Sequence, residues 1–228
     1  MGIGLYCFSG SGHTRAIADY FAGQLNISVS PLPDKKMEEA KELAIVLFPV
    51  YSQNLPDLVR VSLPHINAKR FILIATYGRM SFGNVLQEAS LLIHGKVIAA
   101  AYVPTGHTYL SEGPLFDVGR LQPLFEKIDS TQEIAIPSYQ KNPFANFLPS
   151  LRNRLGVHII QTAKCTKCGL CTQKCPISSM HDGHPDNHCI RCLRCVAICP
   201  QKALTFQLHP FMKWYLRKTK EERFLLFL

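Results

Sequence analysis

The chain has 228 residues, 47% of them hydrophobic and 18% charged, which is the composition of an ordinary soluble protein with a core in at least one domain. Its longest apolar stretches fall far short of the roughly 18 residues that a membrane-spanning helix needs, so a transmembrane segment is excluded. Residues 1–150 carry 12 Lys/Arg and 12 Asp/Glu, whereas residues 151–228 carry 13 Lys/Arg and 4 Asp/Glu. The formal net charge of +9 therefore belongs to the C-terminal third, and such a region is typical of contacts with nucleic acid, an anionic membrane or an acidic protein.

Short apolar runs and longer amphipathic runs alternate over the first 135 residues. Five of the apolar runs are predicted to be strands: Ile3–Phe8, Ile27–Val29 (a weak signal), Ala44–Pro49, Phe71–Thr76 and Val97–Val103. Helical spacing of apolar residues predicts helices over Thr14–Gln24, Asn84–His94 and about 117–128. The strands are continuously apolar, which is typical of a parallel sheet buried on both faces. This alternation predicts a doubly wound α/β domain, in which ligands bind beyond the carboxyl ends of the strands.

The segment between the first strand and the first helix is rich in glycine and hydroxyl groups: Ser9, Gly10, Ser11, Gly12, His13 and Thr14. Glycines allow a tight turn, and the start of the helix presents unpaired N–H groups with a partial positive charge, so the segment can cradle a phosphate. It has neither a Walker A ending nor the dinucleotide fingerprint, so a monophosphate fits it best. The alternative is a helix cap that needs no ligand.

Two further segments follow predicted strands, so they belong at the same edge of the sheet as this loop. They are Pro49, Val50, Tyr51 and Ser52, and Thr76, Tyr77, Gly78 and Arg79. The two tyrosines would supply flat walls for an isoalloxazine ring, and the glycine would let the backbone approach it closely; the alternative for each tyrosine is a packing role. Cys7, inside the first strand, is predicted to be a buried and unreactive thiol.

In these features residues 1–135 resemble the flavodoxin family, whose phosphate loop reads Ser/Thr-x-Thr-Gly-Asn-Thr. The resemblance implies a flavodoxin-like five-stranded parallel sheet of order 2-1-3-4-5, with FMN bound at its edge. It implies that residues 9–14 hold the FMN phosphate, that residues 49–52 and 76–79 flank the ring, and that the loop 104–109 closes on it. Ser11 replaces the family's Thr, and His13 replaces its Asn, a change expected to make phosphate affinity depend on pH.

After residue 136 the periodic pattern stops. Pro137, Pro143 and Pro149 interrupt the segment 137–157 and predict a linker after the domain 1–136. Eight of the nine cysteines follow, in two runs that begin at Cys165 and Cys189 and read Cys-x-x-Cys-x-x-Cys-x-x-x-Cys-Pro. In a cytosolic chain this spacing indicates metal binding rather than disulfides.

These runs make residues 158–207 closely resemble the bacterial two-cluster ferredoxins, small α+β proteins that transfer single electrons at low potential. In that family three cysteines of each run hold one [4Fe–4S] cluster, and the fourth, before Pro, binds the other cluster. The resemblance implies a first cluster held by Cys165, Cys168, Cys171 and Cys199. It implies a second cluster held by Cys189, Cys192, Cys195 and Cys175.

Structural zinc and disulfides are the alternatives for these cysteines, but zinc sites pair one Cys-x-x-Cys knuckle with a distant pair, which the third cysteine of each run does not match. The histidines between the runs, His181, His184 and His188, are expected to be loop residues, because eight cysteines already complete two clusters. Each oxidised cluster carries a charge of about −2, so the basic residues either compensate that charge or form a docking surface, and the two roles can coexist.

Residues 208–228 form a basic, aromatic tail that includes Trp214 and Tyr215, with an amphipathic helix predicted over 211–228. Such a tail packs back onto the protein, docks a partner or makes peripheral membrane contact, and the sequence leaves these alternatives open. No nucleic-acid-binding motif accompanies the charge, so nucleic acid is not an expected partner.

As a whole, the chain resembles the flavodoxin–ferredoxin fusion family, with an N-terminal flavodoxin-like domain and a C-terminal bacterial 2[4Fe–4S] ferredoxin domain. The resemblance implies an electron carrier, which passes low-potential electrons between two [4Fe–4S] clusters and FMN and on to a reductase or an electron-accepting enzyme. A cytoplasmic location is expected because the first residues do not read as a secretory signal, and an anaerobic host is expected because exposed clusters are labile to oxygen. No paired carboxylates or nucleophile–base set stands near the loops, so no catalytic residue is predicted. The alternatives are an FMN-dependent oxidoreductase acting on a small molecule, and a redox-sensing or docking module that lacks FMN.

Overall fold

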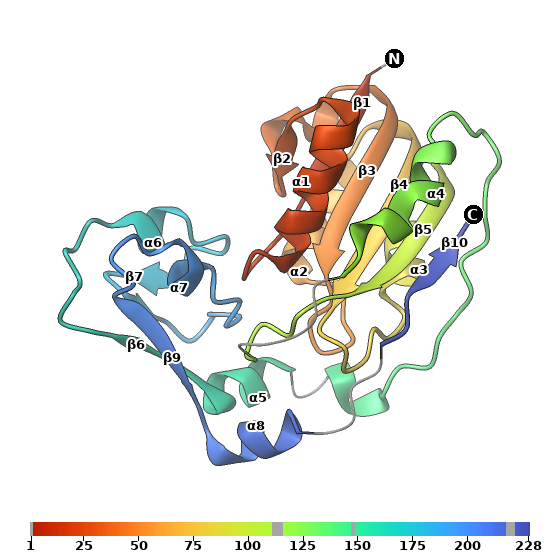
Figure 1. The fold of residues 1–228 in the computed structure, drawn as a ribbon. Helices are drawn as coiled ribbons and strands as arrows, with labels where there is room; N and C mark the ends of the chain where they lie inside the picture. The colour runs from red at the N-terminus through yellow and green to blue at the C-terminus, as the bar shows by residue number, and fades with distance from the viewer. Residues whose placement is uncertain (1, 111–115, 147–148, 218–221) are drawn as a thin grey trace. The chain divides into compact units, whose positions relative to one another are not determined.

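The computed structural model describes residues 2–110, 116–146, 149–217 and 222–228. The chain divides into two compact units (Figure 1). The α/β unit comprises residues 1–9, 13–145 and 221–228, and the cysteine unit comprises residues 10–12 and 146–220. Because the last residues of the chain return to the α/β unit, most of the cysteine unit is an insertion in the α/β unit rather than an appended domain.

A six-stranded sheet forms the centre of the α/β unit, in the order β10-β5-β4-β3-β1-β2. Five strands are parallel to their neighbours: β1 (Ile3–Cys7), β2 (Val29–Pro31), β3 (Lys41–Pro49), β4 (Ala68–Tyr77) and β5 (Lys96–Pro104). The predicted parallel sheet and its order 2-1-3-4-5 are confirmed. The predicted number of five strands is wrong, because β10 (Leu225–Phe227) adds a sixth strand antiparallel to β5.

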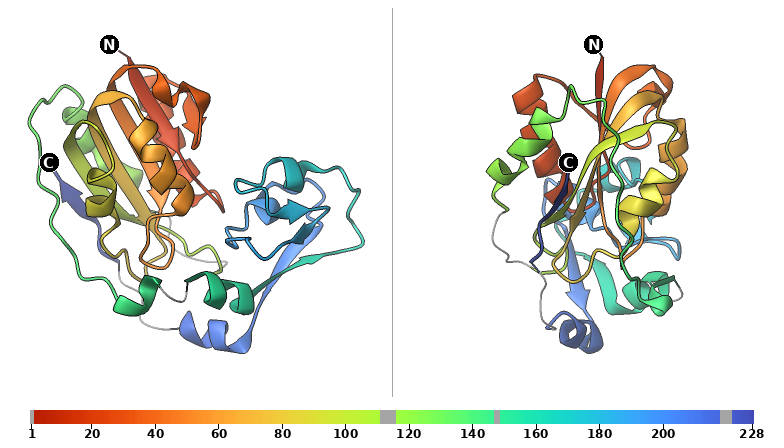
Figure 2. Two further views of the ribbon diagram at one scale, coloured as in Figure 1. Left: turned by 180° about the vertical axis from the view of Figure 1, so that it is seen from behind. Right: turned by 90° about the vertical axis from the view of Figure 1, so that its right-hand side faces the viewer.

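Helices cover both faces of this sheet. They are α1 (His13–Leu25), α2 (Asp57–Ser62), α3 (Val85–Ser90) and α4 (Gln122–Glu126), joined by short 3-10 helices. The edge-on view in Figure 2 shows α1 and α4 on one face and α2 and α3 on the other. This arrangement explains why the strands are continuously apolar: side chains on both faces need a cover, and residues 43–48 of β3 are all buried.

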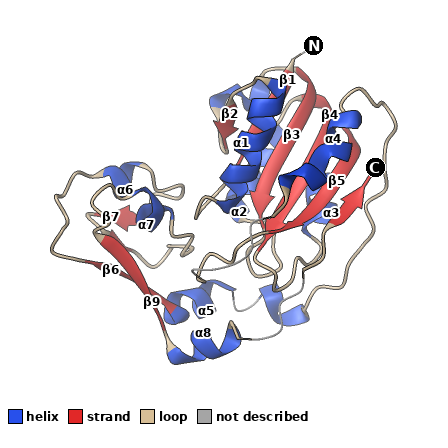
Figure 3. Cartoon of the chain, viewed as in Figure 1, coloured by secondary structure: helices blue, strands red, loops and turns tan. Residues whose placement is uncertain are grey.

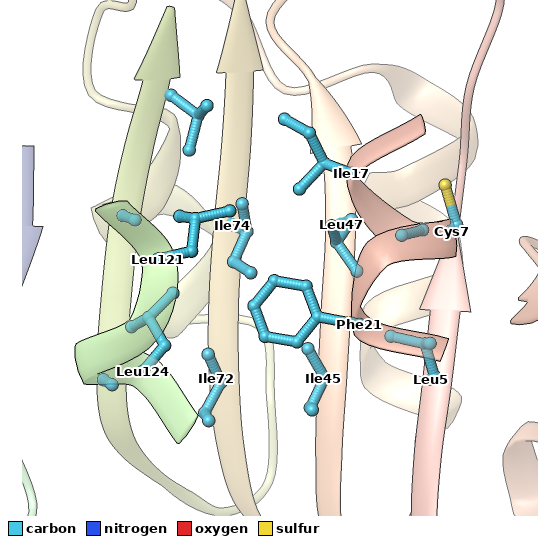
Figure 4. Close-up of a cluster of buried hydrophobic side chains, with 14 of the residues drawn as sticks. Leu5, Cys7, Ile17, Phe21, Ile45, Leu47, Ile72, Ile74, Leu121 and Leu124 are labelled. Carbon is cyan, nitrogen blue, oxygen red and sulfur yellow. The ribbon is translucent and has the colours of Figure 1, made fainter. Parts of the chain in front are cut away.

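The core on the α1 and α4 side is built from these two helices and four strands. Phe21 stacks on Phe125 with ring centroids 4.6 Å apart, and it lies over Ile45 and Ile72 (Figure 4). Cys7 is 4% exposed within this core, as predicted for a buried thiol.

Three predicted elements differ from the observed ones. The helix predicted over 84–94 is the shorter α3, and the one predicted over 117–128 divides into a 3-10 helix, Val118–Leu121, and α4, which starts at a Pro-containing turn. Residues 137–145 of the predicted linker instead pack on the α/β unit: the Tyr139 N–H donates to Asn84 Oδ1 at 3.0 Å, and Lys141 Nζ lies 2.9 Å from Glu88 Oε1. Backbone and side-chain bonds therefore fix a segment that lacks any periodic pattern.

The cysteine unit combines a two-stranded antiparallel ribbon with four short helices (Figure 3). The ribbon pairs β6 (Val157–Gln161) with β9 (Leu204–Leu208), and a small hairpin pairs β7 (Met180–His181) with β8 (His184–Pro185). Its helices are α5 (Pro149–Gly156), α6 (Leu170–Gln173), α7 (Arg194–Ile198) and α8 (Pro210–Tyr215).

The predicted tail 208–228 is therefore not one element. Its first part forms α8 in the cysteine unit, and its last part forms β10 in the α/β unit. None of the described helices is long and apolar enough to cross a lipid bilayer.

Candidate functional site

The two cysteine runs adopt the same backbone shape twice. Left-handed residues occur in the first run at Lys167, Gly169 and Ser178 and recur 24 positions later at Arg191, Leu193 and Lys202. The helices α6 and α7 begin 24 residues apart as well, directly after Gly169 and Leu193. Residues other than glycine rarely adopt positive φ, at a cost of roughly 1–2 kcal/mol each, so its recurrence at equivalent places points to a function for this backbone shape.

One effect of this shape is to direct N–H groups at cysteine sulfurs. The Lys167 N–H lies 3.4 Å from Cys165 Sγ. The fourth cysteines of both runs accept in the same way, from a residue four positions on: Cys175 from Ser179 and Cys199 from Ala203, each at 3.3 Å. Turns that alternate right- and left-handed residues form anion-binding nests, which are common at iron–sulfur sites.

A side chain adds to these backbone donors. Gln161, the last residue of β6, donates its Nε2–H to Cys165 Sγ at 3.0 Å and lies 2.9 Å from the Asp182 carbonyl oxygen. This contact was not predicted, because no local pattern marks a glutamine at a strand end as a partner of a cysteine.

Four cysteines from the two runs line one pocket of about 450 Å³, counting the space at its open mouth. They are Cys165, Cys168, Cys171 and Cys199, the set that the ferredoxin resemblance implies for the first cluster. Leu170 and Leu204 give the pocket apolar walls. Cys168 is the one exposed residue among these four cysteines.

The second predicted set lies deeper. Cys189, Cys192 and Cys195 are 8%, 9% and 7% exposed, and Cys175 is half-buried. Burial, helped by the neighbouring Cys189 and Cys175 and opposed by the Arg194 N–H, raises the pKa of Cys192 to about 11. Burial, with Cys192 and Cys189 nearby, raises the pKa of Cys195 to about 12. Cys192 and Cys195 therefore lie close enough to other cysteines of the second set for the charges to interact, and metal binding would have to displace the protons of these two thiols.

The pKa of Cys199 is shifted in the opposite direction. Burial acts to raise its pKa, but backbone N–H groups of Ala203, Leu204, Gln201 and Lys202 together hold the pKa below the ordinary value for a thiol. This sulfur is therefore held in surroundings that favour the thiolate, which is the form that binds metal.

Within the described ranges, no three or more His, Cys, Asp or Glu side chains converge on a point as the donors of a single metal ion do. A [4Fe–4S] cube binds its four thiolates through four different irons, so its sulfurs surround a space instead of meeting at one point. His181 and His184 pair with each other in the β7–β8 hairpin, so the prediction that they are loop residues is wrong, whereas His188 lies in a turn as predicted. Ring nitrogens of His181 and His188 lie 3.3 Å and 3.9 Å from the Asp186 carboxylate.

The predicted phosphate loop joins β1 to α1; residues 10–12 of it group with the cysteine unit and the rest with the α/β unit. Thr14 Oγ1 lies 2.7 Å from Thr76 Oγ1, and both residues are buried, so the loop meets the end of β4 as predicted. Ser9 Oγ accepts from the Arg15 N–H at 3.2 Å, which is the cap interaction that was the alternative reading of this serine. Gly12 has a φ of +103°, and open space lies where a Cβ would be.

The loop after β5 lies against both of these segments. A Cβ on Gly106 would lie 2.9 Å from the His13 ring, and one on Gly78 would lie 2.7 Å from the His107 ring. The Thr105 N–H donates to the Tyr77 carbonyl oxygen at 2.8 Å. Residues 104–109 thus approach the predicted site, and partial burial lowers the pKa of His13.

The two tyrosines have different surroundings. Tyr51 is half-buried, with its ring edge-on to Phe8 at 6.1 Å, and it precedes a tight turn in which Ser52 and Gln53 have φ of 53° and 66°. Tyr77 is 2% exposed, and its hydroxyl is bonded to the backbone of Arg223. Tyr51 thus fits the role of a ring wall, whereas Tyr77 would have to leave its present contacts to serve as one.

Arg79 is also engaged by the C-terminal segment. It is 6% exposed, with φ of 58°, and its Nη1 lies 3.3 Å from Glu222 Oε1. Residues 222–223 therefore contact both Tyr77 and Arg79 at the predicted ring end of the FMN site.

A comparison of the chain with models of known protein families and with curated proteins gave no match. The assignment of function therefore depends on these two sites.

Proposed function

We propose that this chain is an electron-transfer protein that carries two [4Fe–4S] clusters in its cysteine unit and FMN at the edge of its sheet. It passes low-potential electrons, one at a time, to a redox partner protein. The observation that carries this proposal is the pocket in which Cys165, Cys168 and Cys171 of one run meet Cys199 of the other. Local sequence alone would not bring a cysteine of the second run to the first.

The repeated backbone supports a ferredoxin-like assignment of the cysteine unit. Its left-handed residues and its N–H···S contacts recur at equivalent positions, as expected if each run wraps a cluster of the same kind. When bound, each cluster takes up a single electron and FMN takes up one or two. The donors from Gln161, Lys167, Ser179 and Ala203 would stabilise negative charge on the sulfurs and so favour the reduced state.

A flavodoxin-like role for the α/β unit has support from the edge of the sheet. The loop 9–14, the end of β4 and the loop 104–109 converge there, and the buried Thr14–Thr76 pair links two of them. Residues 9–14 would hold the phosphate of FMN, and Tyr51 would lie beside its ring.

One observation favours a second candidate, a redox-sensing or docking module without FMN. Tyr77 and Arg79 are held by residues 222–223, so the ring end of the site is already engaged by the protein's own chain. The FMN content of the purified protein distinguishes the electron carrier from the module without FMN.

The test is anaerobic purification of the full chain, followed by measurement of iron, sulfide and FMN per chain and a reductive titration. About eight irons, eight sulfides and one FMN, with roughly four electrons accepted, are expected. Eight irons without flavin would leave the second candidate. Zinc in place of iron would refute both.

Matched cysteine variants sharpen this test. Cys168→Ser is expected to lower the iron content to about four per chain, or to abolish iron binding if the two sites fold together. Cys7→Ser is expected to leave the iron content unchanged, because Cys7 lies in the core of the α/β unit.

A further inference from the structure

The repeat allows the two cysteine sites to be compared position by position. Cys168 of the first run is exposed, whereas its equivalent 24 residues later, Cys192, is 9% exposed. Cys165 and Cys171 are half-buried, and their equivalents Cys189 and Cys195 are buried. The fold therefore opens the first site to solvent and closes the second.

The charged residues at equivalent positions also differ between the two cysteine runs. Lys164 and Lys167 flank Cys165 and are exposed, and Lys167 lines the pocket. Their equivalents in the second run are His188 and Arg191, and Arg191 is buried with its Nε–H donating to the Val157 carbonyl oxygen at 3.1 Å. Arg191 of the second run is thus buried and bonded to strand β6, whereas its equivalent in the first run, Lys167, is a cation at the surface.

A third exposed cation stands in the sequence between two residues that line the pocket. Lys202 is exposed, and its neighbours Gln201 and Ala203 both line the pocket. Asp182 also lines the pocket and is the one acidic residue to do so among the described lining residues.

Compensation for cluster charge does not account for this excess of cations. Residues 146–220 contain 12 Lys/Arg and 2 Asp/Glu, and residues 10–12 are uncharged. Two oxidised clusters of about −2 each would leave the unit at about +6. The clusters therefore offset less than half of the unit's net positive charge.

We infer that the Cys168 corner of the first site is the port through which electrons leave, and that a protein with an acidic docking face binds over it on Lys164, Lys167 and Lys202. The inference rests on the proposed function. Electron tunnelling falls steeply with distance, so a partner must dock where a cluster comes nearest the surface. Complementary charge then speeds the encounter and fixes the orientation. In the step itself the reduced first cluster loses one electron and the partner's acceptor gains one, with no bond made or broken.

The experiment compares two charge-reversal variants of the anaerobically purified full chain, Lys164→Glu/Lys167→Glu and Lys213→Glu/Arg217→Glu. Each changes the net charge by the same amount, and the second pair is exposed on and just after α8, away from the cysteine runs. Binding of a glutamate-rich peptide and of a duplex DNA oligonucleotide is measured by calorimetry. Oxidation of the reduced protein by ferricyanide, an anion, and by hexaamminecobalt(III), a cation, is followed by stopped flow.

The first variant is expected to bind the acidic peptide roughly tenfold more weakly, to react roughly tenfold more slowly with ferricyanide and to react faster with the cobalt complex. The second variant is expected to change each of these quantities by less than about threefold. All differences should shrink at high ionic strength.

Equal effects of the two variants would overturn the inference, because net charge alone would then explain them. Tighter binding of DNA than of the peptide to the wild-type protein would overturn it as well. These results are distinct from failure of the proposed function, which would appear beforehand as a purified protein without iron. That outcome would remove the inference together with its premise.

Discussion

The hydroxyl of Tyr77 bonds to both backbone groups of Arg223: it donates to the carbonyl oxygen at 2.6 Å and accepts from the N–H at 2.8 Å. Tyr77 ends β4, and Arg223 stands two residues before β10. One buried side chain thus satisfies the backbone of a segment 146 residues away and fastens the C-terminus to the sheet.

This relationship predicts the effect of removing one oxygen atom. Tyr77→Phe should lower the free energy of unfolding by about 1–3 kcal/mol, because it leaves two backbone groups of Arg223 without their present partner. Urea denaturation measures the change. Tyr20→Phe serves as the control, because Tyr20 packs through its ring on Phe21 and Phe125. Equal stability of Tyr77→Phe and wild type would show that water replaces the bond at no cost.

Alanine substitutions at two glycines test whether a positive φ destabilises the protein when no steric clash is introduced. Gly12 and Gly23 both have open space where a Cβ would be, but only Gly12 has a positive φ, of 103°. Gly12→Ala should destabilise the protein by about 1 kcal/mol, whereas Gly23→Ala, inside α1, should stabilise it by about as much. Thermal or urea unfolding of the two variants checks the opposite signs. The same sign for both would contradict the role assigned to φ.

His13 predicts a pH dependence of stability. Its pKa is lowered in the folded protein by partial burial, so the folded state binds a proton less readily than the unfolded state. The stability that this residue contributes is present above the unfolded pKa of about 6.5 and is lost as the pH falls through the lower, folded pKa. His13→Asn should therefore flatten the fall in unfolding free energy below about pH 6.5. An unchanged slope over that window would rule the mechanism out.

Gln161 predicts a shift in reduction potential, on the proposed function. Its Nε2–H bond to Cys165 favours the more negative, reduced state of the first site, so Gln161→Leu should lower the potential of that site. One hydrogen bond of about 1 kcal/mol corresponds to roughly 40 mV for one electron. Redox titration followed by electron paramagnetic resonance measures it. Gln207→Leu, an exposed change on β9, is the control and should leave both potentials in place.

The sequence predicted most of the sheet because its strands are buried on both faces, and burial on both faces leaves a continuous apolar run. The grouping of Cys199 with the first run was predicted in a different way, from the resemblance of the two repeated cysteine runs to two-cluster ferredoxins. Both signals are local or periodic.

The elements that were missed depend on distant partners. β10 has only three residues, and Leu225–Phe227 becomes a strand because the free edge of β5 accepts it. Leu193 adopts a positive φ although leucine disfavours it, and only the surrounding turn enforces that conformation. The engagement of Tyr77 by Arg223 likewise has no signal in either segment alone.

The insertion of residues 146–220 between two parts of the α/β unit affects how far the protein can be dissected. A protein shortened to residues 1–145 would lose β10 and leave the edge of β5 as an open template for aggregation. Removal of residues 146–220 alone would require a new joint between residues 145 and 221. The cysteine unit is therefore not a detachable module: recombination that exchanges it must cut the chain twice, and a single crossover within it damages the sheet.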